Sequence, residues 1–228
     1  MRVKEDIRHI NRLIDVEDKS VLEVGCGSGR ITFPLAKKAL EIIAIDIDKV
    51  AVEEARKRNR CENVEFLVEN IETVQLGRKF DVIFSTWLGY MYLDNVPKAV
   101  KNISDHLADD GVFLLLCGSV EDEFTKVMDL LLDGRNIKNI SFYIELERLL
   151  CKYFSFEKHV LKGQLVFPGV KDIIQRFRLE LKNDYGVIMD NRHEQRLRDY
   201  LKSKGELVIG YDSVAYLSKK NVHGLVSL

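Results

Sequence analysis

The sequence has few cysteines and few prolines, and it lacks any long apolar run. Its four cysteines are widely spaced, with no C-x-x-C pair and no Cys/His cluster, which disfavours both a zinc site and a disulfide framework. The longest apolar run, residues 112–117, is far too short to span a bilayer. The first residues are charged and no apolar signal region follows them. We therefore expect a cytoplasmic protein without a membrane contact or a bound metal.

The chain also lacks an excess of charge of either sign. Its 35 basic and 36 acidic residues leave a formal net charge of -1, so no overall field is available to capture nucleic acid or an anionic membrane. The charges are nevertheless unevenly spread. Residues 151–228 hold 14 basic and 9 acidic side chains, and residues 1–150 hold 21 and 27. This split fits either solvated helix faces or a mildly basic lid over an anionic substrate.

Short apolar runs alternate with helical patterns through the first half of the chain. Such runs, rich in Val, Ile and Phe, are typical of parallel strands that are buried on both faces. The alternation predicts an α/β fold with an open, doubly wound sheet and right-handed crossovers. The expected strands are Val21–Val24, Ile42–Ile45, Val64–Val68, Val82–Phe84 and Val112–Leu116.

The pattern changes after residue 117. Amphipathic helices are expected after Ser119 and after Asn191, and each of these two residues is expected to cap the N-terminus of its helix. Apolar residues at helical spacing over residues 170–181 predict another amphipathic helix. Phe154 to Phe167 reads as an irregular strand and Glu206 to Leu217 as a final strand, and the two are expected to pair as an antiparallel ribbon at the sheet edge. A single domain is predicted. Its expected parts are residues 1–17 as a flap, 18–117 as a core, about 118–204 as helices, edge strand and lid, and 205–218 as the last strand.

A glycine-rich segment follows the first predicted strand directly. Its sequence, Glu23-Val-Gly-Cys-Gly-Ser-Gly29, precedes an expected helix over Arg30 to Lys38, so the backbone can turn tightly and offer free N–H groups to a ligand. A dinucleotide-binding turn of the form G-x-G-x-x-G/A is one interpretation. Counted from Gly25, however, the third position of that pattern is Arg30, and a large cation there obstructs close helix–strand packing.

The pattern present is acid-x-G-x-G-x-G, which resembles motif I of the class I S-adenosylmethionine-dependent methyltransferases. Further segments match that family in order over residues 18–117. An acidic residue, Asp46, ends the second strand, and Asn70 follows the third, where the family more often has Asp. The resemblance implies a Rossmann-like methyltransferase fold with a mostly parallel seven-stranded sheet and a helical lid insertion.

The resemblance also implies the roles of single residues. Asp46 is expected to accept hydrogen bonds from the cofactor's ribose hydroxyls, and Ile47 to pack on the adenine face. Asn70 and the Ile71 N–H are expected to read the adenine edge. Glu23 either orients the loop or receives the cofactor's ammonium group. The residues expected at the S-adenosylmethionine site are Glu23, Gly25, Cys26, Gly27, Gly29, Asp46, Ile47, Asn70, Ile71 and Ser85.

The segment after the fourth strand is expected to face the substrate. Trp87, Tyr90 and Tyr92 either wall an apolar or cationic site or pack the lid against the sheet. No catalytic residue is assigned. His159 is the one histidine considered as a base, and a surface position is the simpler interpretation.

Three functions follow from these patterns. The leading hypothesis is a methyltransferase that moves a methyl group directly to a small molecule, with S-adenosylhomocysteine as the product. An RNA-modifying methyltransferase is an alternative, motivated by the basic C-terminal part. A non-catalytic module that binds S-adenosylmethionine is the third.

Overall fold

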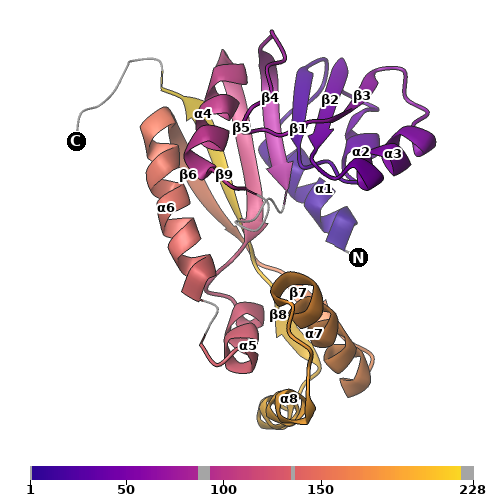
Figure 1. Cartoon of the computed structure of the whole chain (residues 1–228), viewed down its shortest axis with the longest axis vertical. Helices are drawn as coiled ribbons and strands as arrows, with labels where there is room; N and C mark the ends of the chain where they lie inside the picture. The colour runs from indigo at the N-terminus through magenta and orange to yellow at the C-terminus, as the bar shows by residue number, and fades with distance from the viewer. Residues whose placement is uncertain (1, 87–92, 135–136, 222–228) are drawn as a thin grey trace. The chain divides into compact units, whose positions relative to one another are not determined.

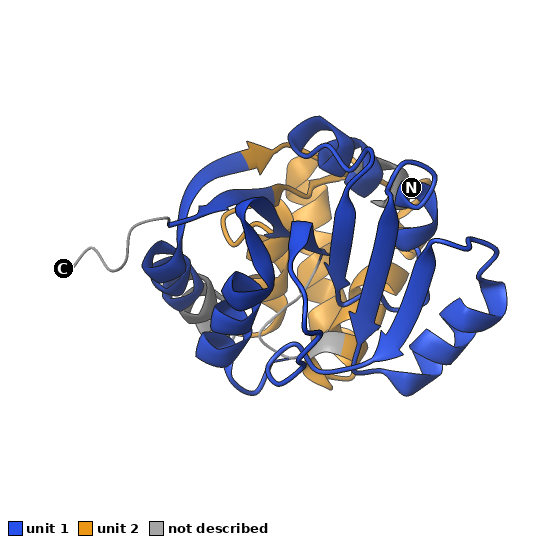
Figure 2. Cartoon of the chain, turned by 90° about the horizontal axis from the view of Figure 1, so that it is seen from above, with its two compact units in different colours: residues 1–117, 144–159, 214–228 blue, residues 118–143, 160–213 orange. Residues whose placement is uncertain are grey.

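The computed structural model describes residues 2–86, 93–134 and 137–221. The chain divides into two compact units, coloured separately in Figure 2. The first unit comprises Met1–Cys117, Ile144–His159 and Val214–Leu228, and the second comprises Gly118–Tyr143 and Val160–Ser213. In the part of the chain that is described, no helix has the length and apolarity needed to cross a membrane.

A seven-stranded sheet with the order β3-β2-β1-β4-β5-β9-β6 organises the first unit (Figure 1). β1 pairs in parallel with β2 and β4, β2 with β3, and β4 with β5. The chain therefore starts in the middle of the sheet, builds outward to β3 and returns to the other side of β1, as a doubly wound sheet does. The strands are β1 (Ser20–Val24), β2 (Glu41–Asp46), β3 (Val64–Val68), β4 (Phe80–Thr86), β5 (Leu107–Gly118), β6 (Phe154–Leu161) and β9 (Ser213–Lys220).

The expected strands of the first half are confirmed, each within the bounds of an observed strand. All five residues of β1 are buried, which fits a strand with neighbours on both sides and helices on both faces. The remaining elements of this unit are α1 (Arg2–Leu13), α2 (Thr32–Leu35), α3 (Lys49–Arg58), α4 (Val96–His106) and the later part of α6 (Ile137–Tyr153).

The helix expected over Arg30 to Lys38 is much shorter than predicted, because α2 covers only Thr32–Leu35. The hydrogen-bond ladder explains the difference. Phe33 N–H donates to the Gly29 carbonyl at 3.2 Å and Leu35 N–H to the Ile31 carbonyl at 3.4 Å. Pro34, between them, has no N–H to donate. The missing bond to the Arg30 carbonyl fits a helix that begins later than predicted, at Thr32, with Pro34 in its first turn, where proline is tolerated.

The two late strands are each divided in the structure. Phe154–Phe167 becomes β6 and β7 (Gln164–Val166), and the final strand becomes β8 (Val208–Gly210) and β9. The pairing itself is confirmed, since β6 neighbours β9 at the sheet edge and β7 pairs antiparallel with β8. Both breaks fall where Gly163 meets Tyr211, whose N–H donates to the Gly163 carbonyl at 3.0 Å. A Cβ on Gly163 would lie only 2.4 Å from the Tyr211 carbonyl oxygen, so this close approach needs a glycine.

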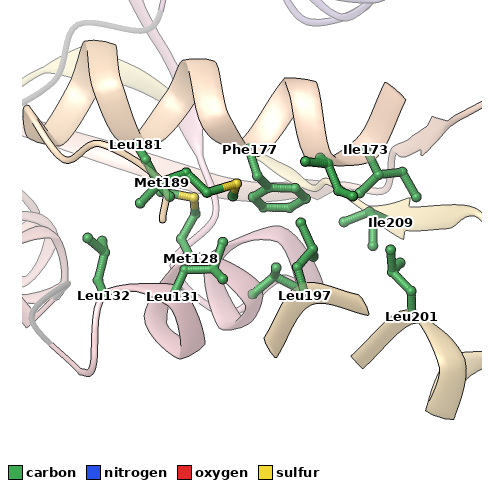
Figure 3. Packing of buried hydrophobic residues seen from close by; sticks show 12 residues of the cluster. Met128, Leu131, Leu132, Ile173, Phe177, Leu181, Met189, Leu197, Leu201 and Ile209 are labelled. Atoms are coloured by element: carbon green, nitrogen blue, oxygen red, sulfur yellow. The ribbon is translucent and has the colours of Figure 1, made fainter. Parts of the chain in front are cut away.

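The second unit has an apolar core of its own. α7 (Val170–Tyr185) lies over α5 (Glu123–Leu131) and α8 (Asn191–Lys204), and Phe177 points from α7 into the space between them (Figure 3). Phe177 also stacks on Phe124, with ring centroids 4.9 Å apart. The predicted stripe over residues 170–181 is thus the buried face of α7. The remaining strands of this unit are β7 and β8.

Two helix caps differ from the prediction. Asp122, rather than Ser119, caps α5 by accepting from Thr125 N–H at 2.8 Å. Asp190, rather than Asn191, caps α8, and His193 completes the capping box. Aspartate is as good a cap as asparagine or serine, so the choice depends on where the helix begins.

Asp122→Ala is expected to lower the free energy of unfolding by about 2 kcal/mol, because two backbone N–H groups lose their acceptor. Its second carboxylate oxygen accepts from Asp212 N–H at 2.9 Å, and the residue is 5% exposed. Asp190→Ala is the matched control, because Asp190 also accepts from two backbone N–H groups, of Arg192 and His193, but is exposed. It is expected to cost about 1 kcal/mol, since water can take the place of the lost acceptor. Equal losses in urea unfolding would contradict the expected effect of burial at Asp122.

Candidate functional site

The glycine-rich loop joins β1 to α2 at the carboxyl end of the sheet. Gly25, Gly27 and Gly29 all have positive φ values, of 81°, 51° and 80°. The N–H groups of Gly25 and Cys26 both donate to the Ile45 carbonyl, at 2.8 and 3.0 Å, which ties the loop to the end of β2. Left-handed backbone of this kind favours glycine over any residue with a Cβ.

Gly27 and Gly29 use this freedom differently. A Cβ on Gly27 would have no heavy atom within 4 Å, whereas a Cβ on Gly29 would lie 2.7 Å from the Phe33 ring and 3.1 Å from Phe66. Gly29 is therefore required by packing as well as by backbone conformation. Gly27 leaves open space beside the loop.

Asp46 joins the loop to the end of β2. One of its carboxylate oxygens accepts from Gly27 N–H at 2.7 Å, and the other accepts from Asp48 N–H at 2.9 Å. Asp48 caps α3 by accepting from the N–H groups of Val50 and Ala51. The side chain of Asp46 is therefore free of the capping role and faces the loop.

A pocket of about 540 Å³ opens where the loop, β2 and β3 end, and its lining lies entirely within the first unit. Eight of the predicted site residues line it together: Glu23, Gly25, Cys26, Gly27, Asp46, Ile47, Asn70 and Ile71. The volume falls in the range of sites that take a cofactor-sized ligand.

Two predicted residues are not among those that line the pocket. Gly29 is turned toward Phe33, as described above. Ser85 is fully buried, and its hydroxyl donates to the Val24 carbonyl at 2.8 Å, which holds β4 against β1. The next residue, Thr86, lines the pocket in its place. Trp87, Tyr90 and Tyr92 lie outside the described residues.

The wall that follows β3 is rigidly built. The Asn70 side-chain oxygen accepts from Glu72 N–H at 2.8 Å, and the Asn70 carbonyl accepts from the N–H groups of Thr73 and Val74. Asn102 of α4 is buried, and its amide donates to the Ile71 carbonyl at 2.7 Å. Ile47, which follows β2, also lines the pocket, and its apolar side chain is 53% exposed.

Sequence reasoning missed several lining residues. Arg30, Asp48, Glu69, Thr86 and Leu93 also border the pocket. Each lies within two residues of a predicted position or of a strand end. A rule that included the neighbours of every strand end would therefore have found most of them.

The pocket is acidic. Its lining carries four carboxyl groups, from Glu23, Asp46, Asp48 and Glu69, and one cationic side chain, Arg30. An excess of carboxylates in a concave site favours cationic ligands and opposes anionic ones.

Glu23 is the most deeply buried of these carboxyl groups. Burial raises its pKa to about 8, although a hydrogen bond from the Thr32 hydroxyl, 2.5 Å long, opposes the rise. Burial also raises the pKa of the Cys26 thiol, and the charges of Glu23 and Asp46 add to the effect. Cys26 is therefore kept as a neutral thiol, which is a poor nucleophile.

Glu23→Gln is expected to become more stable relative to the wild type as the pH rises. An unfolded glutamate ionises above pH 4.5, whereas the folded group holds its proton to about pH 8. The wild type therefore loses stability across that window, and a glutamine does not. Between pH 5 and pH 8 we expect the variant to gain at least about 2 kcal/mol over the wild type in chemical unfolding. A difference that is constant with pH would contradict the burial of a neutral carboxyl group.

His159 lies in β6, and its side chain is 36% exposed and pairs with Glu157 at 3.4 Å. It is not among the residues that line the pocket. Among the described residues, no group of three or more His, Cys, Asp or Glu side chains is arranged to hold a metal ion.

Known proteins match the same part of the chain. Residues 21–111 match a family model described as a methyltransferase domain. The malonyl-[acyl-carrier protein] O-methyltransferase of Bacillus cereus is 30% identical over 170 residues, which are 69% of this chain and 63% of that protein. The chain thus spans less than two thirds of the length of that curated relative.

Two solved structures share the fold. A putative methyltransferase from Bacillus halodurans superposes with a TM-score of 0.64 at 15% identity, and the match covers 94% of this chain and 98% of that one. The N-methyltransferase NodS from Bradyrhizobium japonicum, in complex with S-adenosylhomocysteine, gives a TM-score of 0.59 at 16% identity, with 96% and 87% covered.

The sheet order, the glycine loop and these matches agree with one another. Residues 21–111 match a methyltransferase domain, and the fold and loop resemble those of the class I S-adenosylmethionine-dependent methyltransferases.

Proposed function

We propose that this chain is an S-adenosylmethionine-dependent methyltransferase that transfers a methyl group directly to a small molecule. The observation that carries the proposal is the acidic pocket at the carboxyl ends of β1 and β2, formed by the glycine loop together with Asp46. The cytoplasm is the compartment that fits the four free cysteines.

The donor set of the pocket fits this cofactor. The cofactor carries a sulfonium and an ammonium group, both cationic, and the carboxylates of Asp46, Asp48 and Glu69 favour them. A nicotinamide dinucleotide carries an anionic pyrophosphate, which the same carboxylates oppose. The open space beside Gly27 leaves room for a ligand to approach the backbone closely.

We assign the binding roles as follows. The Asp46 carboxylate accepts hydrogen bonds from the ribose hydroxyls while it still holds the loop through Gly27 N–H. Exposed Ile47 packs on one face of the adenine, and Asn70 and the Ile71 N–H read its edge. Glu23, at the floor of the loop, receives the ammonium group. The rigid Asn102 contacts keep this wall in place without a ligand.

When bound, the cofactor supplies a methyl group on a sulfonium, and its leaving group is a neutral thioether that needs no acid. The chain's own task is therefore to hold an acceptor in line and to exclude water. Thr86 ends β4 beside the pocket and Leu93 borders it, so acceptor contacts are expected around this segment. The proposed role of Trp87, Tyr90 and Tyr92 as substrate-facing residues concerns the same stretch of chain.

The charges of the second unit support a small molecule over RNA. The basic side chains of α8 all have acidic partners within the same unit: Arg192 with Asp190, Arg196 with Asp133, Arg198 with Glu194, Lys202 with Asp199 and Lys204 with Glu123. The excess of basic residues in this part of the sequence is therefore partly neutralised. A phosphate backbone is bound through cations that are available to it.

Transfer of a labelled methyl group tests the proposal. The chain is incubated with methyl-labelled S-adenosylmethionine and either a panel of small amines, alcohols, thiols and carboxylic acids or bulk tRNA. Label in a small molecule is the expected result. Label in tRNA alone would overturn the choice of substrate class. Tight cofactor binding without transfer to any acceptor would favour a non-catalytic binding module.

A further inference from the structure

Glu23 lies in an apolar section of the sheet. Its neighbours across the ladders are Ala44 of β2 and Phe84 of β4, and neither can donate a side-chain hydrogen bond. The side chain is 1% exposed. A carboxyl group in such a place is costly unless it is neutral or paired.

The Thr32 hydroxyl is the partner of Glu23. It donates to one carboxylate oxygen at 2.5 Å, and Thr32 is itself fully buried at the start of α2. Among the described residues, no other side chain makes a hydrogen bond to Glu23. A hydroxyl that donates to a carboxyl group favours its ionised form.

The other charged groups around Glu23 are few. Asp46, from the end of β2, disfavours its ionisation, and Arg30, from the loop, favours it. The Cys26 thiol is neutral, as described above. The hydrogen bond from Thr32 is thus the main influence within the protein that opposes the effect of burial.

We infer that Thr32 is a positioning residue: its hydroxyl holds the Glu23 carboxyl at the floor of the pocket and sets the pH at which the pocket accepts the cationic end of its ligand. The inference rests on the proposed function, because it takes the ligand to be S-adenosylmethionine or S-adenosylhomocysteine. Binding then moves one proton. The carboxyl group gives it to solvent, and the ligand's ammonium group takes its place beside the carboxylate.

Titration of S-adenosylhomocysteine against the full-length chain, between about pH 6 and pH 9, tests the inference. The wild type is expected to bind more tightly as the pH rises toward the pKa of Glu23, about 8. Thr32→Val is expected to move the midpoint upward, so that affinity falls about tenfold at pH 7, and the difference from the wild type narrows to about twofold at pH 9. Thr32→Ser keeps the hydroxyl and is expected to restore the wild-type profile.

The ligand's own ionisation affects the affinity of every variant equally, so comparing variants at the same pH cancels its contribution. When Glu23→Gln is already present, adding Thr32→Val is expected to cause no pH-dependent change in affinity. A Thr32→Val variant that binds more weakly by the same factor at every pH would show a structural role only, and would overturn the inference. Binding of the wild type with no pH dependence would also overturn it, while leaving the proposed function intact.

A second measurement needs no variant. At pH 7 the wild type is expected to release close to one proton for each ligand bound, measured by calorimetry in two buffers of different ionisation enthalpy. Absence of proton release would overturn the inference. Absence of binding at any pH would overturn the proposed function, and the inference with it.

Discussion

Gly29→Ala is expected to lower the free energy of unfolding by about 3 kcal/mol, from a left-handed residue with a Cβ and an overpacked contact together. Gly29 has φ +80°, and an added Cβ would lie 2.7 Å from the Phe33 ring. The ring cannot move freely away, because it also packs on Phe66 with 5.6 Å between centroids. Urea unfolding of the variant and the wild type measures the loss.

Gly77→Ala is the matched control for this variant. Gly77 has a similar φ, +67°, but a Cβ there would meet no atom within 4 Å. Only the cost of a left-handed backbone conformation remains in this variant, so the expected loss in the free energy of unfolding is about 1 kcal/mol. If the two variants were equally destabilised, the packing role assigned to Gly29 would be wrong.

Asp46→Ala is expected to weaken binding of S-adenosylhomocysteine by about 2–4 kcal/mol, or roughly 30- to 1,000-fold. Two effects add in this variant. The ribose hydroxyls lose a charged acceptor, and Gly27 N–H loses the partner that holds the loop at 2.7 Å. Calorimetric titration gives the affinity directly.

Asp46→Asn separates the two effects. An amide oxygen can still accept from Gly27 N–H, so the loop is kept while the charge is lost. An affinity between those of the wild type and Asp46→Ala is therefore expected. Asp190→Ala serves as a control for general destabilisation, because it removes a helix cap that does not line the pocket. Unchanged affinity in Asp46→Ala would contradict the ribose assignment.

The first half of the fold could be predicted because its signals are local. β1 to β5 each contain a short apolar run between polar residues, and β1 and β4 are buried along almost their whole length. The late start of α2 could also have been inferred, since Pro34 is visible in the sequence and favours the first turn of a helix. The divided late strands could not. Both breaks lie at the contact between Gly163 and Tyr211, which are 48 positions apart in the sequence.

The residues of the site likewise differ in how far the sequence predicts them. Glu23, Asp46 and Asn70 follow strand ends in sequence, so their convergence on one pocket follows from a parallel sheet. The partner of Glu23 gives no such signal. Thr32 is nine residues away across an irregular turn, and nothing in the spacing predicts that its hydroxyl turns back toward the strand. The same is true of Ser85, whose hydroxyl faces Val24 rather than the pocket.

Titration calorimetry with S-adenosylmethionine, S-adenosylhomocysteine and NAD tests the central claim most directly. We expect micromolar binding of the first two ligands and no binding of NAD, because the carboxylates of Asp46, Asp48 and Glu69 outnumber the one cationic side chain of the pocket, Arg30. Preference for NAD, or failure to bind either S-adenosylmethionine or S-adenosylhomocysteine, would contradict the assignment of this pocket. Only the description of the fold would then stand.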